Sequence, residues 1–268
     1  MTEVPPPSED TSAAGPRYEQ RYCAFVDVLG FTELLKKFGT HDKYTELRNI
    51  LFAIHSPRAS PFEKPFAGSD LRAQSISDAV CISTAASAPG LLHLMSALQF
   101  STLDVLSEGV LVRGAVVKDY LYHAPGIVFG QALVRAYLLE SKIVKYPRVM
   151  LTSDVVKDSE TYAANAPYTE AFKGRVTQAD DGPYFLDYFW EIRGIMERGD
   201  MNGGEILDRY QAMAYLIQDN LREAFDVPAY FEKWQWIANY WNRTAAALGL
   251  IPIEGPGIVP PKEPGQTA

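Results

Sequence analysis

The stretch Phe25-Val26-Asp27-Val28-Leu29-Gly30-Phe31-Thr32 decides how the rest of the chain is interpreted. The apolar run at 22–26 predicts a buried strand that ends at a carboxylate, followed by a short Leu-Gly turn and the start of a helix. A carboxylate at a strand end is able to bind a metal ion, and the free N–H groups of a helix start are able to bind phosphate oxygens. The stretch therefore favours a site for a metal–nucleotide complex. An Asp before a Gly turn also serves as a cap or turn former, so this alternative stays open.

Length and composition indicate one sizeable globular domain, with or without an appendage. The chain has 268 residues, of which 47% are hydrophobic and 22% charged, and its formal net charge is −8. Such a charge argues against nucleic acid or an anionic membrane surface as a partner. No apolar run approaches the roughly 18 residues of a membrane span, and the first residues lack the pattern of a signal peptide. Cys23 and Cys81 both lie in apolar runs, which predicts buried thiols and favours a reducing, cytoplasmic setting.

Between two Pro-rich ends, expected to be disordered at 1–17 and 254–268, the chain alternates strands and helices. Helical spacing at 33–38 and 43–54 is followed by a hairpin whose strands, 71–76 and 79–83, flank the pair Ser77-Asp78. A helix is predicted at 89–107, a strand at 109–117, a short hairpin at 119–129, a helix from Gly130 and a strand at 148–151. This βααββαβ order predicts an α+β fold with helices on one face of a sheet.

The C-terminal part has a different character. We divide the chain into a main domain at 18–155 and a mixed, then helical, extension at 156–253, with helix expected from Tyr184 onward. Pro228 opens an aromatic helix that contains Trp234, Trp236 and Trp241. These aromatic side chains either pack onto the sheet domain or form a subunit interface, and the two interpretations are compatible.

Two carboxylates are the candidates for metal binding. If the strand before Asp27 pairs with the strand after Asp78, the two side chains converge and could share one or two divalent cations. Phosphoryl chemistry uses this arrangement, because Mg²⁺ and Mn²⁺ keep oxygen ligands from carboxylates and substrate phosphates. Carboxylates at turns are also common for structural reasons alone.

Four successive motifs resemble those of the class III nucleotide cyclases, and within them the pyrimidine, especially uridylate, cyclases of the bacterial Pycsar anti-phage system. They are the opening stretch, Ser75-Ile76-Ser77-Asp78-Ala79-Val80, Val112-Arg113-Gly114-Ala115-Val116, and Val128-Phe129-Gly130-Gln131-Ala132. The resemblance covers roughly residues 20–155. It implies a ferredoxin-like catalytic domain with a C-terminal helical extension, and a homodimer with active sites at the interface.

The resemblance also implies the chemistry and the residues that perform it. UTP would be converted into 3′,5′-cyclic UMP, a second messenger for a separate effector in anti-phage defence. Two Mn²⁺ or Mg²⁺ ions would be bound by Asp27, Asp78 and the backbone carbonyl of Val28. The triphosphate would be held by the backbone of Leu29, Gly30, Phe31 and Thr32.

Some positions depart from the family pattern. Gln74 or the neighbouring Arg72, and Ile127, stand where purine-using members read adenine, which favours a pyrimidine. Gln74 either reads the base edge or faces solvent. Val134 and Leu138 replace the usual transition-state Asn and Arg. Arg135 and Arg113 are the candidates to supply that charge, the alternatives being a surface ion pair for Arg135 and a snorkelling side chain for Arg113. A cytidylate or purine cyclase and an inactive nucleotide-binding module remain alternative functions.

Overall fold

The computed structural model describes residues 15–38, 40, 43–55, 68–190, 192, 194 and 203–260, so most of the two expected tails, 1–14 and 261–268, lies outside the described residues. The elements are β1 (Glu19–Val28), α1 (Phe31–Phe38), α2 (Tyr44–His55), β2 (Arg72–Ile76), β3 (Ala79–Ala85), α3 (Ala88–Ser107), β4 (Val112–Ala124), β5 (Ile127–Gly130), α4 (Gln131–Lys142), β6 (Val149–Leu151), α5 (Ser153–Ala163), α6 (Thr169–Phe172), β7 (Val176–Gln178), β8 (Tyr184–Leu186), α8 (Gly203–Glu223) and α9 (Pro228–Leu248).

The sheet is built around β1. Its strand order is β2-β3-β1-β4-β6-β8-β7, with β5 paired to β4 outside this path. The first four strands pair antiparallel throughout, which is the order and direction of a ferredoxin-like sheet, and β6 adds to β4 in parallel. The predicted α+β class and βααββαβ order are therefore confirmed. The second predicted hairpin also forms, but its first strand is the continuation of β4.

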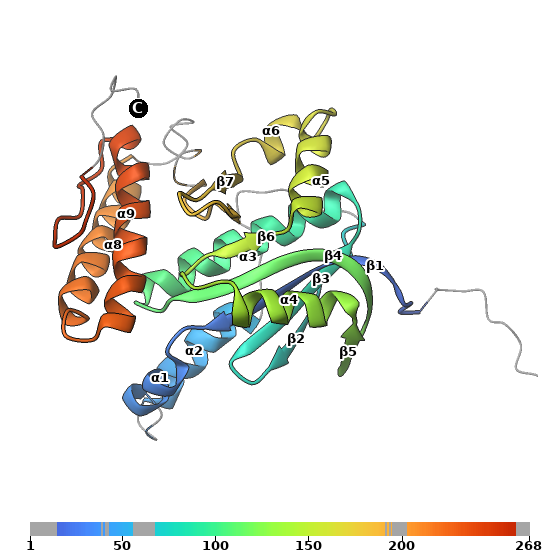
Figure 1. The fold of residues 1–268 in the computed structure, drawn as a ribbon, viewed down its shortest axis with the longest axis horizontal. Helices are drawn as coiled ribbons and strands as arrows, with labels where there is room; N and C mark the ends of the chain where they lie inside the picture. The colour runs from blue at the N-terminus through green and yellow to red at the C-terminus, as the bar shows by residue number, and fades with distance from the viewer. Residues whose placement is uncertain are drawn as a thin grey trace, which may run out of the picture.

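Helices cover both faces of the sheet, which corrects the expectation of helices on one face (Figure 1). Even-numbered residues of β1, such as Val26, form a core with α2, α3 and α5. Odd-numbered residues, such as Phe25, face the opposite side and pack with Ala132 and Ala136 of α4. Because successive side chains of a strand point to opposite faces, both faces of β1 are buried. The alanines of α4 allow this helix to lie close to the sheet.

The region after α6 is not wholly helical. Residues 184–186 form β8, which pairs with β6 and β7 at the sheet edge, so the expected onset of helix at Tyr184 was wrong. Phe185 and Leu186 are buried there. The aromatic side chains of α9 pack against this edge: Tyr240 contacts the rings of Phe185 and Phe189, and Trp241 is fully buried. Packing onto the sheet domain thus accounts for much of the aromatic content of α9.

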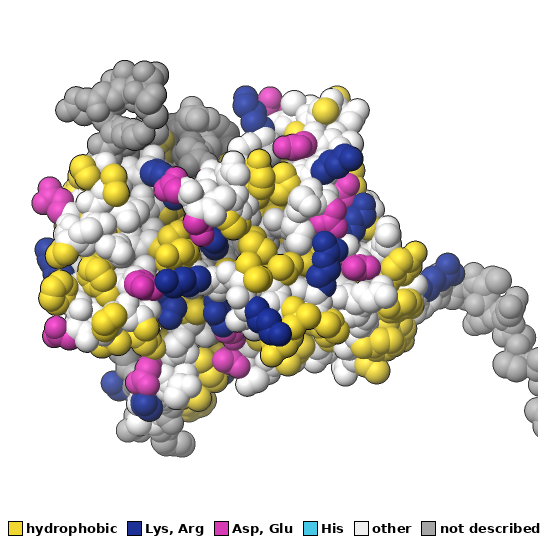
Figure 2. All heavy atoms as spheres, in the orientation of Figure 1, with side chains coloured by type: hydrophobic (Ala, Val, Ile, Leu, Met, Phe, Trp, Pro, Cys, Tyr) yellow, Lys and Arg dark blue, Asp and Glu magenta, His cyan; other side chains and the backbone are white. Residues whose placement is uncertain are grey.

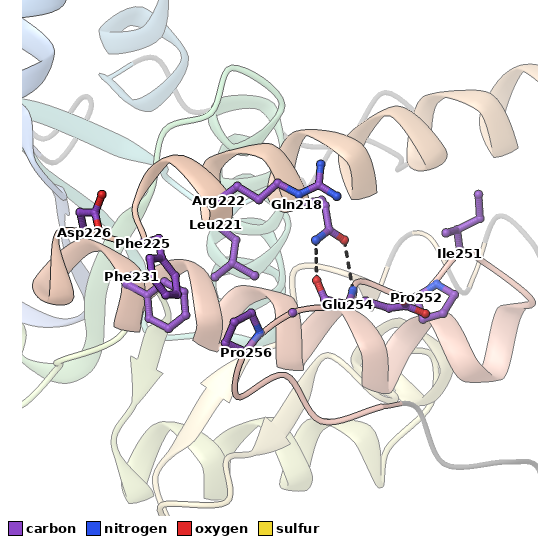
Figure 3. A pocket seen from close by; sticks show the side chains of 11 residues that line it. Gln218, Leu221, Arg222, Phe225, Asp226, Phe231, Ile251, Pro252, Glu254 and Pro256 are labelled. Atoms are coloured by element: carbon purple, nitrogen blue, oxygen red, sulfur yellow. Dashed lines mark hydrogen bonds between the residues drawn. The ribbon is translucent and has the colours of Figure 1, made fainter.

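The segment after α9 folds back along the two C-terminal helices, whereas disorder was expected from Glu254. Figure 3 shows the amide of Gln218 directed at the backbone of Glu254, whose N–H donates to it at 3.1 Å. Further along, Asn242 donates to the carbonyl of Val259 at 3.0 Å. Helix amides thus satisfy a Pro- and Gly-rich backbone that has no secondary structure of its own. Among the described residues, no helix combines the length and apolar character needed to cross a membrane.

Candidate functional site

Asp27 lies one residue before the end of β1, on the sheet face covered by α4. It is directly opposite Ala79 on β3 and Arg113 on β4. Asp78 immediately precedes Ala79 in the two-residue turn between β2 and β3, where Ser77 has a φ of 60°. The strand register therefore brings the two predicted aspartates together, although they are far apart in the sequence.

The electrostatics of Asp27 reflect this arrangement. Burial raises the pKa of its carboxyl, and the negative charge of Asp78 raises it further. The guanidinium of Arg113 and a hydrogen bond from the backbone N–H of Val28 act in the opposite direction but do not cancel the rise. Arg113 Nη2 lies 3.7 Å from Asp27 Oδ2. Because the carboxylates of Asp27 and Asp78 repel each other, a positive charge at this end of β1 stabilises their ionised forms.

Glu140 is a member of this group that the sequence analysis missed. Its Oε1 lies 2.6 Å from Arg113 Nε, and its side chain is only 3% exposed. Burial raises the pKa of Glu140, and the charges of Asp27 and Asp78 add to the rise, while Arg113 opposes it. Ala132, Ala136 and Glu140 follow at intervals of four along α4, so all three lie on one face of this helix. The two alanines mark that face as the one packed on the sheet, and this spacing could have predicted that Glu140 is buried there.

The turn between β1 and α1 presents free backbone donors beside Asp27. Gly30 has a φ of +75°, and its carbonyl accepts hydrogen bonds from the N–H groups of Glu33 and Leu34. Within the part of the chain that the structure describes, the N–H groups of Gly30, Phe31 and Thr32 donate to no backbone carbonyl. The N–H of Leu29 donates to Leu111 O at 2.8 Å. The turn therefore offers backbone donors from Gly30 onward, whereas the N–H of the predicted Leu29 is already used within the sheet.

The structure separates the other two candidates. Gln74 is opposite Cys81, which shares the sheet face of Asp27, so Gln74 lies on the same face two strands away. Arg135 lies near the other end of the sheet, 3.6 Å from Asp119 and 3.5 Å from Asp154. Because Asp119 follows Arg113 by six positions on β4, the carboxylate that pairs with Arg135 lies about 20 Å along the strand from the position opposite Asp27.

The donor set at Asp27 and Asp78 fits a hard divalent cation. Two carboxylates and the carbonyl of Val28 would supply oxygen ligands, and the pKa of Asp27 is raised by burial and, in second place, by the charge of Asp78. The structure, as far as it is described, contains no group of three or more His, Cys, Asp or Glu side chains placed to bind a metal. A metal here would thus need ligands from substrate or water, as Mg²⁺ and Mn²⁺ sites in phosphoryl transfer commonly do.

Neither a protein-family model nor a curated protein matches this sequence. Among solved structures, the chain is similar to the crystal structure of the catalytic core of a rhodopsin-guanylyl cyclase with converted specificity in complex with ATPalphaS. The identity is 14%, the match covers 63% of this chain and 95% of that chain, and the TM-score is 0.34.

Proposed function

We propose that this protein is a nucleotide cyclase that converts UTP into 3′,5′-cyclic UMP and diphosphate. The observation that carries the proposal is the meeting of Asp27, Asp78 and Arg113 at one end of the sheet, directly beside the free N–H groups of the β1–α1 turn. Phosphoryl transfer needs carboxylates for cations, donors for phosphate oxygens and positive charge for the transition state, and all three occur here.

In this proposal the protein's groups position a nucleoside triphosphate for attack on itself. The N–H groups of Gly30, Phe31 and Thr32 bind the triphosphate, and Arg113 stabilises charge on the α-phosphate. Asp27, Asp78 and the carbonyl of Val28 would bind two Mn²⁺ or Mg²⁺ ions, which when bound lower the pKa of the attacking hydroxyl and neutralise phosphate charge. The ribose O3′–Pα bond forms, the bond from Pα to the diphosphate breaks, and the hydroxyl proton passes to solvent.

Substrate choice is assigned to Gln74. It shares the face of Asp27, and its side-chain amide offers one donor group and one acceptor, which match the edge of a pyrimidine. In the structure the Gln74 amide donates to Ser75 O at 3.3 Å, a weak bond that a nucleobase is able to replace. We therefore propose a pyrimidine, and uracil before cytosine.

The active form in this proposal is a homodimer. Apolar side chains are exposed along the outer face of α4 and on β5, and the space-filling view shows such side chains gathered over this part of the molecule (Figure 2). Those more than a third exposed include Ile127, Phe129, Val134, Leu138 and Ile143. Apolar surface of this kind marks an interaction site, and a second copy of the chain would cover it.

The decisive experiment incubates the purified protein with ATP, GTP, CTP or UTP in Mn²⁺ and follows both cyclic product and released diphosphate. We expect a cyclic product from UTP, and its loss in Asp27→Asn and in Asp78→Asn. Lys173→Gln, a substitution at an exposed position directly after α6, serves as the control that keeps full activity. A cyclic product from another nucleotide would refute the base assignment alone. Turnover that survives in either Asp variant would refute the metal site, and no product from any nucleotide would favour an inactive nucleotide-binding module.

A further inference from the structure

The C-terminal helix α9 contacts the β1–α1 turn directly. Tyr230 lies in its first turn, and the hydroxyl of this tyrosine occupies the space where a Cβ at Gly30 would stand. Leu29 packs against the same hydrophobic cluster as Tyr230. A residue far along the chain is thus placed against the backbone proposed to bind the triphosphate.

Lys233 is on the same face of α9, one turn after Tyr230. Its ammonium lies 5.5 Å from the centroid of the Tyr230 ring. The neighbouring Glu232 pairs with Lys145 at 2.9 Å, and Lys233 has no ion-pair partner among the residues that the structure describes. Burial and the positive charges of Arg113 and Lys145 lower the pKa of Lys233, whereas Glu232 raises it. The cationic end of Lys233 is therefore within electrostatic reach of Arg113, and adjacent cations of this kind favour an anion between them.

A cavity of about 240 Å³ lies beside the contact between α9 and the turn. Leu29 and Gly30 line one wall, and Tyr230 and Lys233 line another. Glu33 also faces this cavity but is neutralised by Lys36, whose Nζ lies 2.7 Å from Glu33 Oε1. Glu223 is a further acidic residue of the lining. The hydroxyl of Tyr230 is the donor placed directly at Gly30, and the ammonium of Lys233 lies beside the ring of the same tyrosine.

We propose that Tyr230 and Lys233 bind the terminal phosphates of the nucleotide, so that the C-terminal helices complete the substrate site. The inference rests on the proposed function for the position of the triphosphate at Gly30, Phe31 and Thr32. The tyrosine hydroxyl donates one hydrogen bond and the ammonium donates up to three, and both residues line the cavity that Gly30 also lines. Removal of either group weakens phosphate binding without disturbing the carboxylates.

The test measures the affinity of the full chain for inorganic tripolyphosphate with Mn²⁺ by calorimetry, and the KM and kcat for UTP alongside. Lys233→Gln is expected to raise the dissociation constant for tripolyphosphate about tenfold, since it removes a charge-assisted hydrogen bond. Tyr230→Phe is expected to raise it about threefold, since it removes a neutral one. Both variants should raise KM with kcat little changed, because phosphate contacts act equally before and during the reaction.

Matched controls are Lys173→Gln and Tyr215→Phe, which remove the same groups at exposed positions elsewhere. Melting temperatures that stay close to wild type separate lost binding from lost folding. If wild-type protein makes cyclic product while the tripolyphosphate affinity of Lys233→Gln is unchanged, the inference fails and the proposed function stands. If no cyclic product forms but the affinity still drops in Lys233→Gln, the inference stands and the proposed function fails. Tighter binding in Tyr230→Phe would mean that the tyrosine blocks the cradle, which overturns the inference.

Discussion

Replacing Arg113 by Gln is the change whose consequences the structure specifies most fully. The guanidinium lies between two acids, 2.6 Å from Glu140 and 3.7 Å from Asp27. Glutamine keeps a polar side chain but removes the positive charge. Glu140, which is 3% exposed, would then be a buried carboxylate without its cation.

The expected loss of folding stability in Arg113→Gln follows from the burial of Glu140. Breaking a buried ion pair by removing one partner costs about 3–5 kcal/mol. The side chain of Arg113 is 25% exposed, so water screens part of the interaction and we expect a smaller loss, about 2–3 kcal/mol. For a chain of this size, each kcal/mol lowers the melting temperature by about 2–4 °C. Arg113→Gln should therefore melt about 5–10 °C below wild type.

The loss of folding stability in Arg113→Gln should depend on pH in a defined direction. The pKa of Glu140 is already raised in the folded protein, and the loss of Arg113 raises it further. An acid with a raised folded pKa destabilises the fold above that pKa, and this cost disappears below the ordinary carboxyl value. The difference in melting temperature between wild type and Arg113→Gln should therefore be largest near pH 7 and shrink as the pH falls.

Thermal denaturation of four proteins between pH 4 and pH 8 tests this argument. They are wild type, Arg113→Gln, Glu140→Gln and the double variant, with Arg243→Gln as the control because its pair with Asp180 is exposed. The double variant should be more stable than Arg113→Gln, since the buried charge is gone. A melting temperature for Arg113→Gln within about 1 °C of wild type, or a double variant no more stable than the single one, would refute the reasoning.

Two further changes test the turn and the dimer. Gly30→Ala should destabilise the protein and weaken UTP binding, because φ at Gly30 is +75° and the new Cβ meets Tyr230. Gly126 has a similar φ of +80° but open space around its Cβ position, so Gly126→Ala is the control. Comparing the two variants by thermal denaturation and calorimetry isolates the effect of the tyrosine contact. Leu138→Asp should convert a dimer into monomer on size-exclusion chromatography with light scattering, whereas Leu35→Asp, equally exposed on α1, should not. A Leu138→Asp variant that remains dimeric would place the interface elsewhere.

The sequence predicted the βααββαβ order of the core because local patterns determine it, whereas the ferredoxin-like fold was implied by the family resemblance. The apolar run before Asp27 and the hairpin around Ser77-Asp78 carry their own strand and turn signals, and their pairing brought the two aspartates together. The edge strands β7 and β8 were missed because each has three residues, too few to show a period. β8 pairs with β6 and buries Phe185 in the cluster that contains α9, and β7 pairs with β8, which no local pattern encodes.

The missed site residues share one physical cause. Glu140, Tyr230 and Lys233 lie on helices, and each reaches the site only because the whole helix is placed there by packing elsewhere. Glu140 follows the small-residue face of α4, which lies on β1 and β4. Tyr230 and Lys233 depend on aromatic contacts further along α9, such as the stacking of Trp236 on Tyr146 at 6.0 Å. Long-range packing therefore determined which polar side chains met at the turn.

The position of Arg135 links the proposed chemistry to the proposed dimer. Within one chain Arg135 pairs with Asp119 and Asp154, and Asp119 is six strand positions from Arg113, so these pairs hold the guanidinium away from a nucleotide at Gly30. It lies on the same helix as the exposed Val134 and Leu138, which are the residues expected to contact a second copy. If Arg135 stabilises the transition state, it therefore does so in the active site of the partner subunit. If the protein acts as a monomer, Arg113 is left as the arginine that serves Asp27, and the ion pairs of Arg135 are structural.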